Sequence, residues 1–499
     1  MQALHDECLR GAKYLSRLLE ALGAEVKLAQ PYEGKNPVVL GRLGHNPAYP
    51  TVAFYGHYDV QPAEEPDWKT NPFEMTAVDG YLCGRGTSDN KGPVLAFIYA
   101  VKEMLDCWRM AGLAAPINVA FMFEGEEENG SLGFKESVAA NLDWFRDAVL
   151  VVISNTVWVG ENKPCLTYGM RGMVTASLVV SGPERDLHSG NDSGVFSEPM
   201  ADLVQLLGAL HGPGGKISVP GFSNHVRPQL MDLAWQGLQH SEEFAMQSYR
   251  QAIGVPELTA PPNTYDLLNK RWCSPSLSIA PSYAGVGGAD DRSCYRFGPT
   301  RFSVIPKVAV GKLSLRFVPE QDHQTLIECL QQHIEKRFKL LWSANRVELQ
   351  VHSVGDWWEA DPQSQLFQMA ERAVRREWGE PPLYVREGGT MPVASLIEKM
   401  LGAPALMIPM GQSSDNCHLA NERLRRVNLI KGKNVVSGKR AVLTRGVGVW
   451  VRLCCVRWCG SLRKVSREVA SYACIQAQAE WGQSYGRASL RHQQGCWDG

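Results

Sequence analysis

The sequence predicts an α/β fold in which helices flank a mixed β-sheet, with a smaller α+β domain inserted between two parts of the larger one. Short apolar runs alternate with helical patterns up to about residue 153. Near residue 172 longer strand patterns and Pro/Gly-rich stretches replace that alternation, which returns after residue 357. A chain of 499 residues is also too long for one ordinary core.

The first part of the larger domain is predicted to cover residues 1–171. Its opening helix, residues 9–22, repeats apolar residues at helical spacing and stops at Gly23. Four apolar runs are short enough for strands buried on both faces, and one longer pattern fits a helix. The strands are expected at residues 38–40, 52–55, 119–123 and 149–153, and the helix at 92–105.

The inserted domain is predicted to cover residues 172–355, with strands at 174–180 and 308–317. The second part of the larger domain then covers residues 356–436, with a helix at 363–378 and a strand at 405–408.

Residues 437–499 differ in character. They hold ten lysines and arginines against three acidic residues, and five of the thirteen cysteines, without a sustained amphipathic period. Two interpretations stay open: a basic interaction tail, or a disordered, aberrant stretch such as a shifted reading frame, never selected to fold.

Bulk composition restricts the class of partner. A formal net charge of −1 leaves no basic excess to neutralise phosphates, which argues against a nucleic-acid binder. No stretch approaches the roughly 20 apolar residues that cross a bilayer, and residues 1–7 lack the apolar core of a secretory signal. The cysteines follow no metal-finger or disulfide spacing. We therefore expect a cytoplasmic protein with small or peptidic partners.

Five short segments each offer a metal ligand or a proton carrier, and together they suit a two-metal hydrolase. They are Gly56-His57-Tyr58-Asp59, Gly86-Thr87-Ser88-Asp89-Asn90, Glu126-Glu127-Glu128-Asn129-Gly130, Asp186-Leu187-His188-Ser189-Gly190 and Asp415-Asn416-Cys417-His418. Zinc and similar ions take imidazole and carboxylate ligands. His57 directly follows a predicted strand, where α/β sheets build their sites.

Neighbouring residues supply the other roles. Asp59 can accept the second imidazole N–H of His57 and fix its tautomer. Of the pair Glu127 and Glu128, one carboxylate can bind metal while the other takes a proton from water. Each fragment alone is weak evidence for a metal site. The 84–92 loop, for example, could instead cradle phosphate, although it lacks the Gly-Lys-Ser/Thr ending of a P-loop.

In order along the chain, these fragments resemble the M20 metallopeptidases, especially the carnosinase-like and cysteinylglycine dipeptidases. The motifs that carry the resemblance are Gly56-His57-Tyr58-Asp59-Val60-Gln61-Pro62, Gly84-Arg85-Gly86-Thr87-Ser88-Asp89-Asn90-Lys91-Gly92-Pro93, Glu124-Gly125-Glu126-Glu127-Glu128-Asn129-Gly130-Ser131 and Arg386-Glu387-Gly388-Gly389-Thr390. The resemblance covers about residues 10–436. It implies a zinc-peptidase-like larger domain, which is the catalytic one, and an inserted lid or dimerisation domain.

The resemblance also implies roles for individual residues. Two divalent metal ions, zinc or manganese, would be held by His57, bridging Asp89, Glu128, His418 and the residue at position 155. Asp59 would orient His57, and Glu127 would be the general base. Arg316 and the turn of Gly388, Gly389 and Thr390 would hold the carboxylate end of a small peptide. His188 would reach the partner subunit's site in a homodimer and stabilise the oxyanion.

One departure from the family pattern concerns a ligand. Where the dipeptidases have Ser-Asp-Asn before a tryptophan, this chain has Ser154-Asn155-Thr156 before Trp158, so Asn155 replaces a carboxylate. An amide oxygen can coordinate, but it neutralises no metal charge.

The chain also resembles the M20-domain subunit of a fungal glutathione-degrading complex. This resemblance is carried by Ser154-Asn155, by Pro164 to Gly169 and by Gly411 to Asn416. That subunit works with a glutamine-amidotransferase-like partner. The resemblance leaves two functions: a metal-dependent hydrolase of small peptides in glutathione or Cys-Gly breakdown, or a catalytically weakened scaffold subunit of such a complex.

Overall fold

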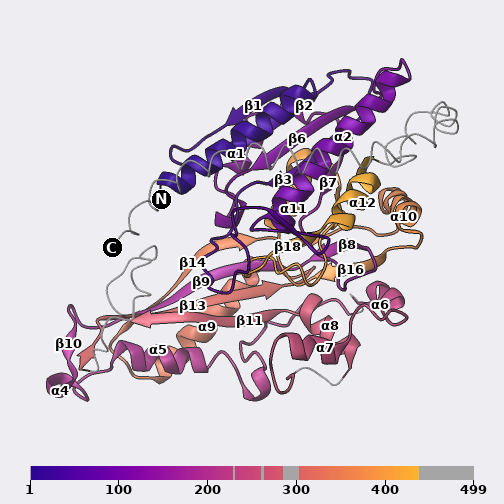
Figure 1. The fold of residues 1–499 in the computed structure, drawn as a ribbon. Coiled ribbons are helices and arrows are strands. Elements are labelled where there is room, and N and C mark those ends of the chain that lie inside the picture. Colours follow the sequence, from indigo (N-terminus) through magenta and orange to yellow (C-terminus); the bar gives the residue numbers. More distant parts are fainter. Residues whose placement is uncertain (1, 229–230, 260–262, 285–302, 438–499) are drawn as a thin grey trace, which may run out of the picture. The chain divides into compact units, whose positions relative to one another are not determined.

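The computed structural model describes residues 2–228, 231–259, 263–284 and 303–437 (Figure 1). The chain folds into two compact units. Unit 1 comprises the residues up to 168, residues 360–385 and those from 397 on, and unit 2 comprises residues 169–359 and 386–396. The segment 386–396 is thus grouped with unit 2, whereas the sequence division placed it in the larger domain.

Unit 1 contains a mixed sheet with strand order β1-β2-β6-β3-β7-β17-β8. The strands on this path are β1 (Glu25–Ala29), β2 (Val38–Leu43), β3 (Thr51–His57), β6 (Asn118–Glu124), β7 (Ala148–Ile153), β8 (Cys165–Met170) and β17 (Ala405–Met407), and β16 (Leu383–Glu387) also pairs with β8. β8 runs on into unit 2 at Gly169, where its last two residues pair with β15 (Trp358–Glu359). A small separate sheet joins β4 (Thr76–Val78), β5 (Tyr81–Cys83) and β18 (Arg423–Arg425).

Four neighbouring strands of this sheet, β6, β3, β7 and β17, run parallel. Every residue of β3 and β6 is buried, as their unbroken apolar runs predict for strands covered on both faces. The rings of Phe54, Phe97 and Phe121 meet between β3, β6 and helix α2 (Gly92–Met110). Because the strands are parallel, their carboxyl ends share one edge of the sheet.

Helices cover this sheet. α1 (Gln2–Ala21) packs on β1 and β2, α2 on β3 and on α12 (Arg426–Ser437), and α10 (Gln365–Trp378) on α12. The short helix α3 (Phe134–Ala139) belongs to the same unit, and α11 (Pro392–Leu401) crosses the boundary between the units at residue 397. α10 begins after Ser364, whose hydroxyl accepts the N–H of Phe367, as an N-cap serine does.

Unit 2 is built on a four-stranded antiparallel sheet with order β11-β13-β9-β14 (Figure 1). These strands are β9 (Gly172–Ser181), β11 (Ser276–Ala284), β13 (Val308–Phe317) and β14 (Arg346–Gly355). Helices α5 (Pro199–Gly208) and α9 (His323–Leu340) pack against it around buried Leu203, Leu315 and Ile334. The remaining elements are β10 (Leu187–His188), α4 (Ser189–Asp192), α6 (Asp232–Leu238), α7 (Met246–Ala252), α8 (Thr264–Trp272) and β12 (Val304–Ile305).

Apart from Ser437, which ends α12, the basic tail predicted from residue 437 lies outside the described residues. Among the helices that the structure describes, none has the length and apolar character needed to cross a membrane.

Candidate metal centre

The site in unit 1 lies at the edge where the parallel strands end. His57 is the last residue of β3, Glu127 and Glu128 follow β6, and Asn155 lies two residues beyond β7. The segment after β17 leads to His418, and Asp89 comes from the turn that precedes α2. Strand ends therefore place His57, Glu127, Glu128 and Asn155, whereas Asp89 lies in the turn before α2 and His418 in the loop between β17 and β18.

The Asp89 carboxylate lies between two imidazoles. Its Oδ1 is 2.9 Å from His57 Nε2, and its Oδ2 is 2.9 Å from His418 Nε2. One oxygen thus faces each histidine, which is the arrangement that a carboxylate shared by two metal ions requires.

Two further carboxylates complete two groups of metal-ligating atoms. Glu127 Oε2 is 3.9 Å from His57 Nε2, and Glu128 Oε2 is 3.2 Å from His418 Nε2. His57, Glu127 and Glu128 form one group with ligand atoms within 4.8 Å of one another, and Asp89, Glu128 and His418 form the other. The structure thus brings together four of the five residues expected to bind metal and the expected base.

Asp59 lies behind His57 and is buried. Its Oδ1 is 3.3 Å from His57 Nδ1, and its Oδ2 accepts the backbone N–H of Glu128 at 2.9 Å. Asp59 therefore contacts the ring nitrogen of His57 that faces away from Asp89, and it also fixes the backbone at Glu128.

The carboxylates draw protons onto both imidazoles. Hydrogen bonds to Asp89 and Glu128 raise the pKa of His418 to about 10. Burial alone would lower the pKa of His57, but hydrogen bonds to Asp59 and Asp89 raise it well above its ordinary value. Burial would raise the pKa of Asp89, yet its bonds to His418 and His57 hold that pKa well below its usual range. The site favours positive charge, and a divalent cation would replace these protons.

The donor set fits such a cation. It combines imidazole nitrogens with carboxylate oxygens, the ligands that zinc and manganese accept. Glu128 Oε1 is buried and has no hydrogen-bond partner, although an unpaired buried carboxylate oxygen is costly. Its other oxygen accepts the Gln61 amide at 2.8 Å. A metal ion would satisfy the unpaired oxygen.

Asn155 is held by a neighbouring amide. Asn90 Nδ2 donates to Asn155 Oδ1 at 2.9 Å and to the carbonyl of Ser154 at 2.5 Å. Asn90 Oδ1 in turn lies 3.4 Å from the backbone N–H of His57. Asn90 therefore links the carboxyl ends of β3 and β7, and an aspartate at position 155 could accept the same hydrogen bond.

A second buried acid, Glu124, lies at the end of β6 beside the site. Its Oε1 accepts the Tyr55 and Ser131 hydroxyls, and its Oε2 has no partner. Burial, together with the charges of Glu127 and Asp59, raises the pKa of Glu124 to about 8. The folded protein therefore keeps a proton there between about pH 4.5 and 8 that the unfolded chain releases.

Glu124 should accordingly stabilise the fold below about pH 4.5, and this stability should be lost as the pH rises through about 8. Glu124→Gln cannot titrate. We expect the free energy of unfolding of this variant, relative to the wild type, to rise by up to about 1.4 kcal/mol per pH unit across that range. Urea unfolding of chelator-treated protein at pH 5 and pH 8 measures it. A difference independent of pH would contradict the assignment.

Unit 2 contains the residues expected to bind a carboxylate. Arg316 Nη1 donates to Thr390 Oγ1 at 2.6 Å, and Arg171 Nε donates to the Gly388 carbonyl at 2.8 Å. The N–H groups of Gly388 and Gly389 already donate to a carboxylate oxygen of Glu387, at 2.7 and 3.2 Å. Burial, together with the charge of Arg316, lowers the pKa of Arg171 to about 10. The arrangement favours anions.

His188 also lies in unit 2, at the end of β10, and is exposed. Its Nδ1 accepts the N–H of Gly190 at 3.0 Å. The role expected for it in a partner subunit's site stays a prediction.

Sequence reasoning missed Arg171, because an isolated arginine in a strand pattern carries no signal of its own. It also missed Glu422, whose carboxylate contacts the Asp89 turn from 333 residues away. Its position four residues after His418 was the one available indication.

Comparison with known proteins agrees with this geometry. The sequence profile of Peptidase family M20/M25/M40 matches residues 53–438. The Cys-Gly metallodipeptidase DUG1 of Candida albicans is 36% identical over 452 residues, covering 88% of this chain and 90% of that protein. The human Beta-Ala-His dipeptidase is 36% identical over 398 residues, covering 79% and 75%. The solved structure of the di-peptidase Dug1p from Saccharomyces cerevisiae has a TM-score of 0.76 at 33% identity, covering 88% of this chain and 91% of that one.

The expected fold class is confirmed by this structural neighbour. The scaffold-subunit alternative gains no support. The probable di- and tripeptidase DUG2 of S. cerevisiae is 33% identical over 84% of this chain, but the match covers 46% of that protein. The Candida albicans and human relatives, which are covered to 90% and 75% of their length, are named as dipeptidases. The chain belongs to the M20 family of metallopeptidases.

Proposed function

We propose that this chain is a two-metal dipeptidase that hydrolyses Cys-Gly and contributes to glutathione breakdown. The observation that carries the proposal is the Asp89 carboxylate, 2.9 Å from an imidazole nitrogen on each of its two oxygens. The similarity to DUG1, which is named as a Cys-Gly metallodipeptidase, supports the choice of substrate.

The residues of unit 1 divide between binding metal and moving a proton. His57, Asp89, Glu128 and His418 would hold two divalent ions, with Asn155 as a neutral ligand. Bound there, the ions would polarise the peptide carbonyl and make water more acidic. Zinc and manganese both suit the donor set.

Glu127 is the proposed general base. Burial, together with the charges of Asp89 and Glu128, raises the pKa of Glu127 to about 7. A carboxylate of that pKa can take the proton of the attacking water and return it to the leaving amine. Asp59 orients His57 throughout.

The groups of unit 2 would recognise the substrate. Arg316 and Thr390 offer a guanidinium and a hydroxyl to the C-terminal carboxylate of a dipeptide. The N–H groups of Gly388 and Gly389, which already hold one carboxylate, could take part. We further propose a homodimer in which His188 stabilises the oxyanion, and a cytoplasmic location. A glutamine-amidotransferase-like partner is a prediction from the sequence resemblance.

Asn155→Asp should strengthen metal binding, because it adds a negative charge while keeping the acceptor that Asn90 uses. We expect the Kd of the second equivalent of Zn²⁺ or Mn²⁺ to fall at least about tenfold, which corresponds to about 1.4 kcal/mol of binding free energy. Competition with a chromophoric chelator measures the affinity. Asn155→Ala, which removes the oxygen, is the matched control and should weaken binding. Unchanged affinity in Asn155→Asp would remove position 155 from the ligand set.

A substrate panel tests the proposed function. Protein reconstituted with metal should hydrolyse Cys-Gly with a kcat/KM at least about tenfold above that for β-Ala-His, the scale on which pocket contacts discriminate related substrates. Esterifying the C-terminal carboxylate of Cys-Gly should raise KM, since Arg316 would lose its charged partner. A preference for β-Ala-His would instead assign a carnosinase-type specificity.

A further inference from the structure

A buried ion pair in unit 1 takes no part in the chemistry proposed above. Arg85 Nη1 lies 3.0 Å from Glu422 Oε2, and the side chains are 1% and 0% exposed. A buried charge needs hydrogen bonds that offset its lost hydration. Arg85 Nη1 and Nη2 and both oxygens of Glu422 make such bonds, whereas Arg85 Nε has no hydrogen-bond partner among the described residues.

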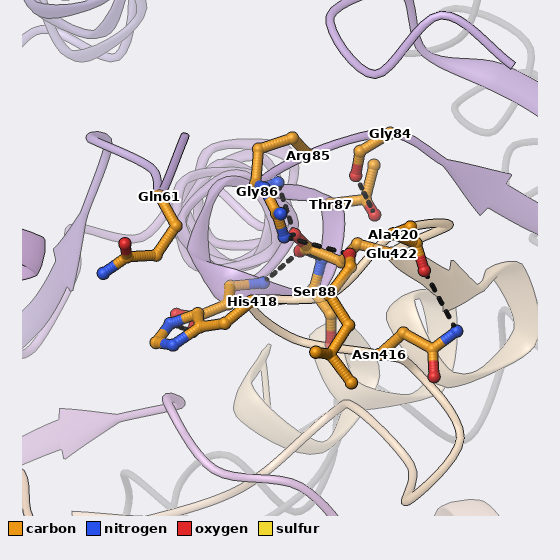
Figure 2. Close-up of polar contacts among 12 residues, drawn as sticks. Gln61, Gly84, Arg85, Gly86, Thr87, Ser88, Asn416, His418, Ala420 and Glu422 are labelled. Carbon is orange, nitrogen blue, oxygen red and sulfur yellow. Dashed lines mark hydrogen bonds and ion pairs between the residues drawn. The ribbon is translucent and has the colours of Figure 1, made fainter. Parts of the chain in front are cut away.

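The Glu422 carboxylate accepts hydrogen bonds from the backbone of Gly86 and Ser88 (Figure 2), in the turn that carries Asp89. Its Oε1 accepts the N–H groups of Ser88 and of Asp89, both at 3.0 Å, and its Oε2 accepts the N–H of Gly86 at 2.9 Å. Three N–H donors of one turn therefore converge on one carboxylate. Gly86 has φ 86°, and a Cβ there would lie 2.5 Å from Val60 Cγ1, so this position of the turn requires glycine.

The Arg85 guanidinium joins two other segments to this turn. Nη1 also donates to the Leu419 carbonyl at 3.3 Å, one residue after His418. Nη2 donates to the Pro62 carbonyl and to Glu65, both at 3.1 Å, and Pro62 follows the strand end that bears His57. The planar fork of arginine suits such divergent acceptors, whereas a lysine ammonium would reach fewer.

The loop that presents His418 depends on such anchoring. His418 itself has φ 64°, and Asn416 and Asn421 have φ 56° and 62°. Non-glycine residues rarely adopt this left-handed conformation, and they keep it where the surroundings fix it. Glu422 ends the loop, while Asp415, which begins it, accepts the Ser88 hydroxyl at 3.0 Å. Both ends of the loop are therefore attached to the turn that carries Asp89.

We infer that Arg85 and Glu422 form a positioning pair, which sets the separation of His57, Asp89 and His418 and thereby the affinity and geometry of the metal centre. The inference rests on the metal site proposed above. Replacing residues that hold the metal ligands without touching the metal typically changes metal affinity or activity by about 10–100-fold.

Cobalt binding to the full chain tests the pair, because bound Co²⁺ reports ligand geometry through its visible absorption. The first variant is Glu422→Gln, in which an NH₂ group replaces one of the two acceptor oxygens and so faces N–H donors. The second is Arg85→Lys. Glu161→Gln is the matched control. Its carboxylate also anchors a neighbouring stretch of chain, accepting the hydroxyls of Ser413 and Ser414 at 2.5 and 2.7 Å. Neither of these two contacts involves Arg85 or Glu422.

We expect folded Glu422→Gln and Arg85→Lys to bind Co²⁺ at least about tenfold more weakly, with altered absorption and a kcat that falls more than KM changes. Glu161→Gln should keep the wild-type spectrum and affinity. Wild-type spectra and affinities in both test variants would overturn the inference. Failure of both to fold would also overturn it, by assigning the pair to global stability. If the wild type bound no Co²⁺, the metal site itself would fail.

Discussion

Glu127→Gln is expected to lower kcat for Cys-Gly by about 10²–10⁴-fold while leaving KM within a few-fold, because general base catalysis contributes that much. The glutamine is isosteric and keeps the fold, but it cannot accept a proton from water. Initial rates at saturating substrate, with metal content checked in the same sample, measure the effect.

The neighbouring Glu126 supplies the control. Its Oε1 accepts the backbone N–H of Asn36 at 2.9 Å, and its Oε2 lies 3.3 Å from the Lys35 ammonium. Both oxygens are thus used in holding the 35–36 segment. Glu126→Gln should lower stability and leave kcat nearly unchanged. Equal losses of kcat in the two variants would show that charge in this segment, rather than the Glu127 carboxylate, supports turnover.

Asp89→Asn should remove activity because it weakens metal binding, while the general base Glu127 stays in place. Its carboxylate faces His57 and His418 with one oxygen each, and an amide would present one oxygen and one NH₂ group to the two imidazoles. We expect fewer than one tightly bound ion per chain. Turnover should fall by at least about 10³-fold, since the ions supply several kcal/mol of transition-state stabilisation and 1.36 kcal/mol is a factor of ten.

Metal analysis after gel filtration, together with circular dichroism, separates this result from misfolding. Asp106→Asn is a suitable comparison, since Asp106 pairs with Lys102 and Arg109 on the surface of α2. Two bound ions in folded Asp89→Asn would show that the carboxylate does not bridge.

The sequence identified the residues that strand ends position. His57 and the pair Glu127 and Glu128 follow short apolar runs that are typical of buried strands. Because parallel strands end at one edge of a sheet, these residues were expected to lie close together. Asp89 and His418 needed the order of motifs along the chain, because neither lies directly at a strand end. The family and the fold class predicted from these motifs are confirmed.

Contacts between distant segments could not be predicted. Arg85 and Glu422 are 337 residues apart, and no periodicity connects them. The start of α1 at Gln2, rather than at residue 9, was missed because residues 2–8 are polar enough to lack a clear apolar stripe. The contacts of Asn155 with Asn90 likewise depend on which strands become neighbours.

The most direct test of the two-metal account is Cys-Gly hydrolysis by chelator-treated full chain as Zn²⁺ or Mn²⁺ is restored in measured equivalents. We expect no turnover without metal and a rise to a maximum near two ions per chain. Glu127→Gln should bind the same two ions without this rise in turnover. Turnover in the stripped protein, or none from a folded chain holding two ions, would contradict it.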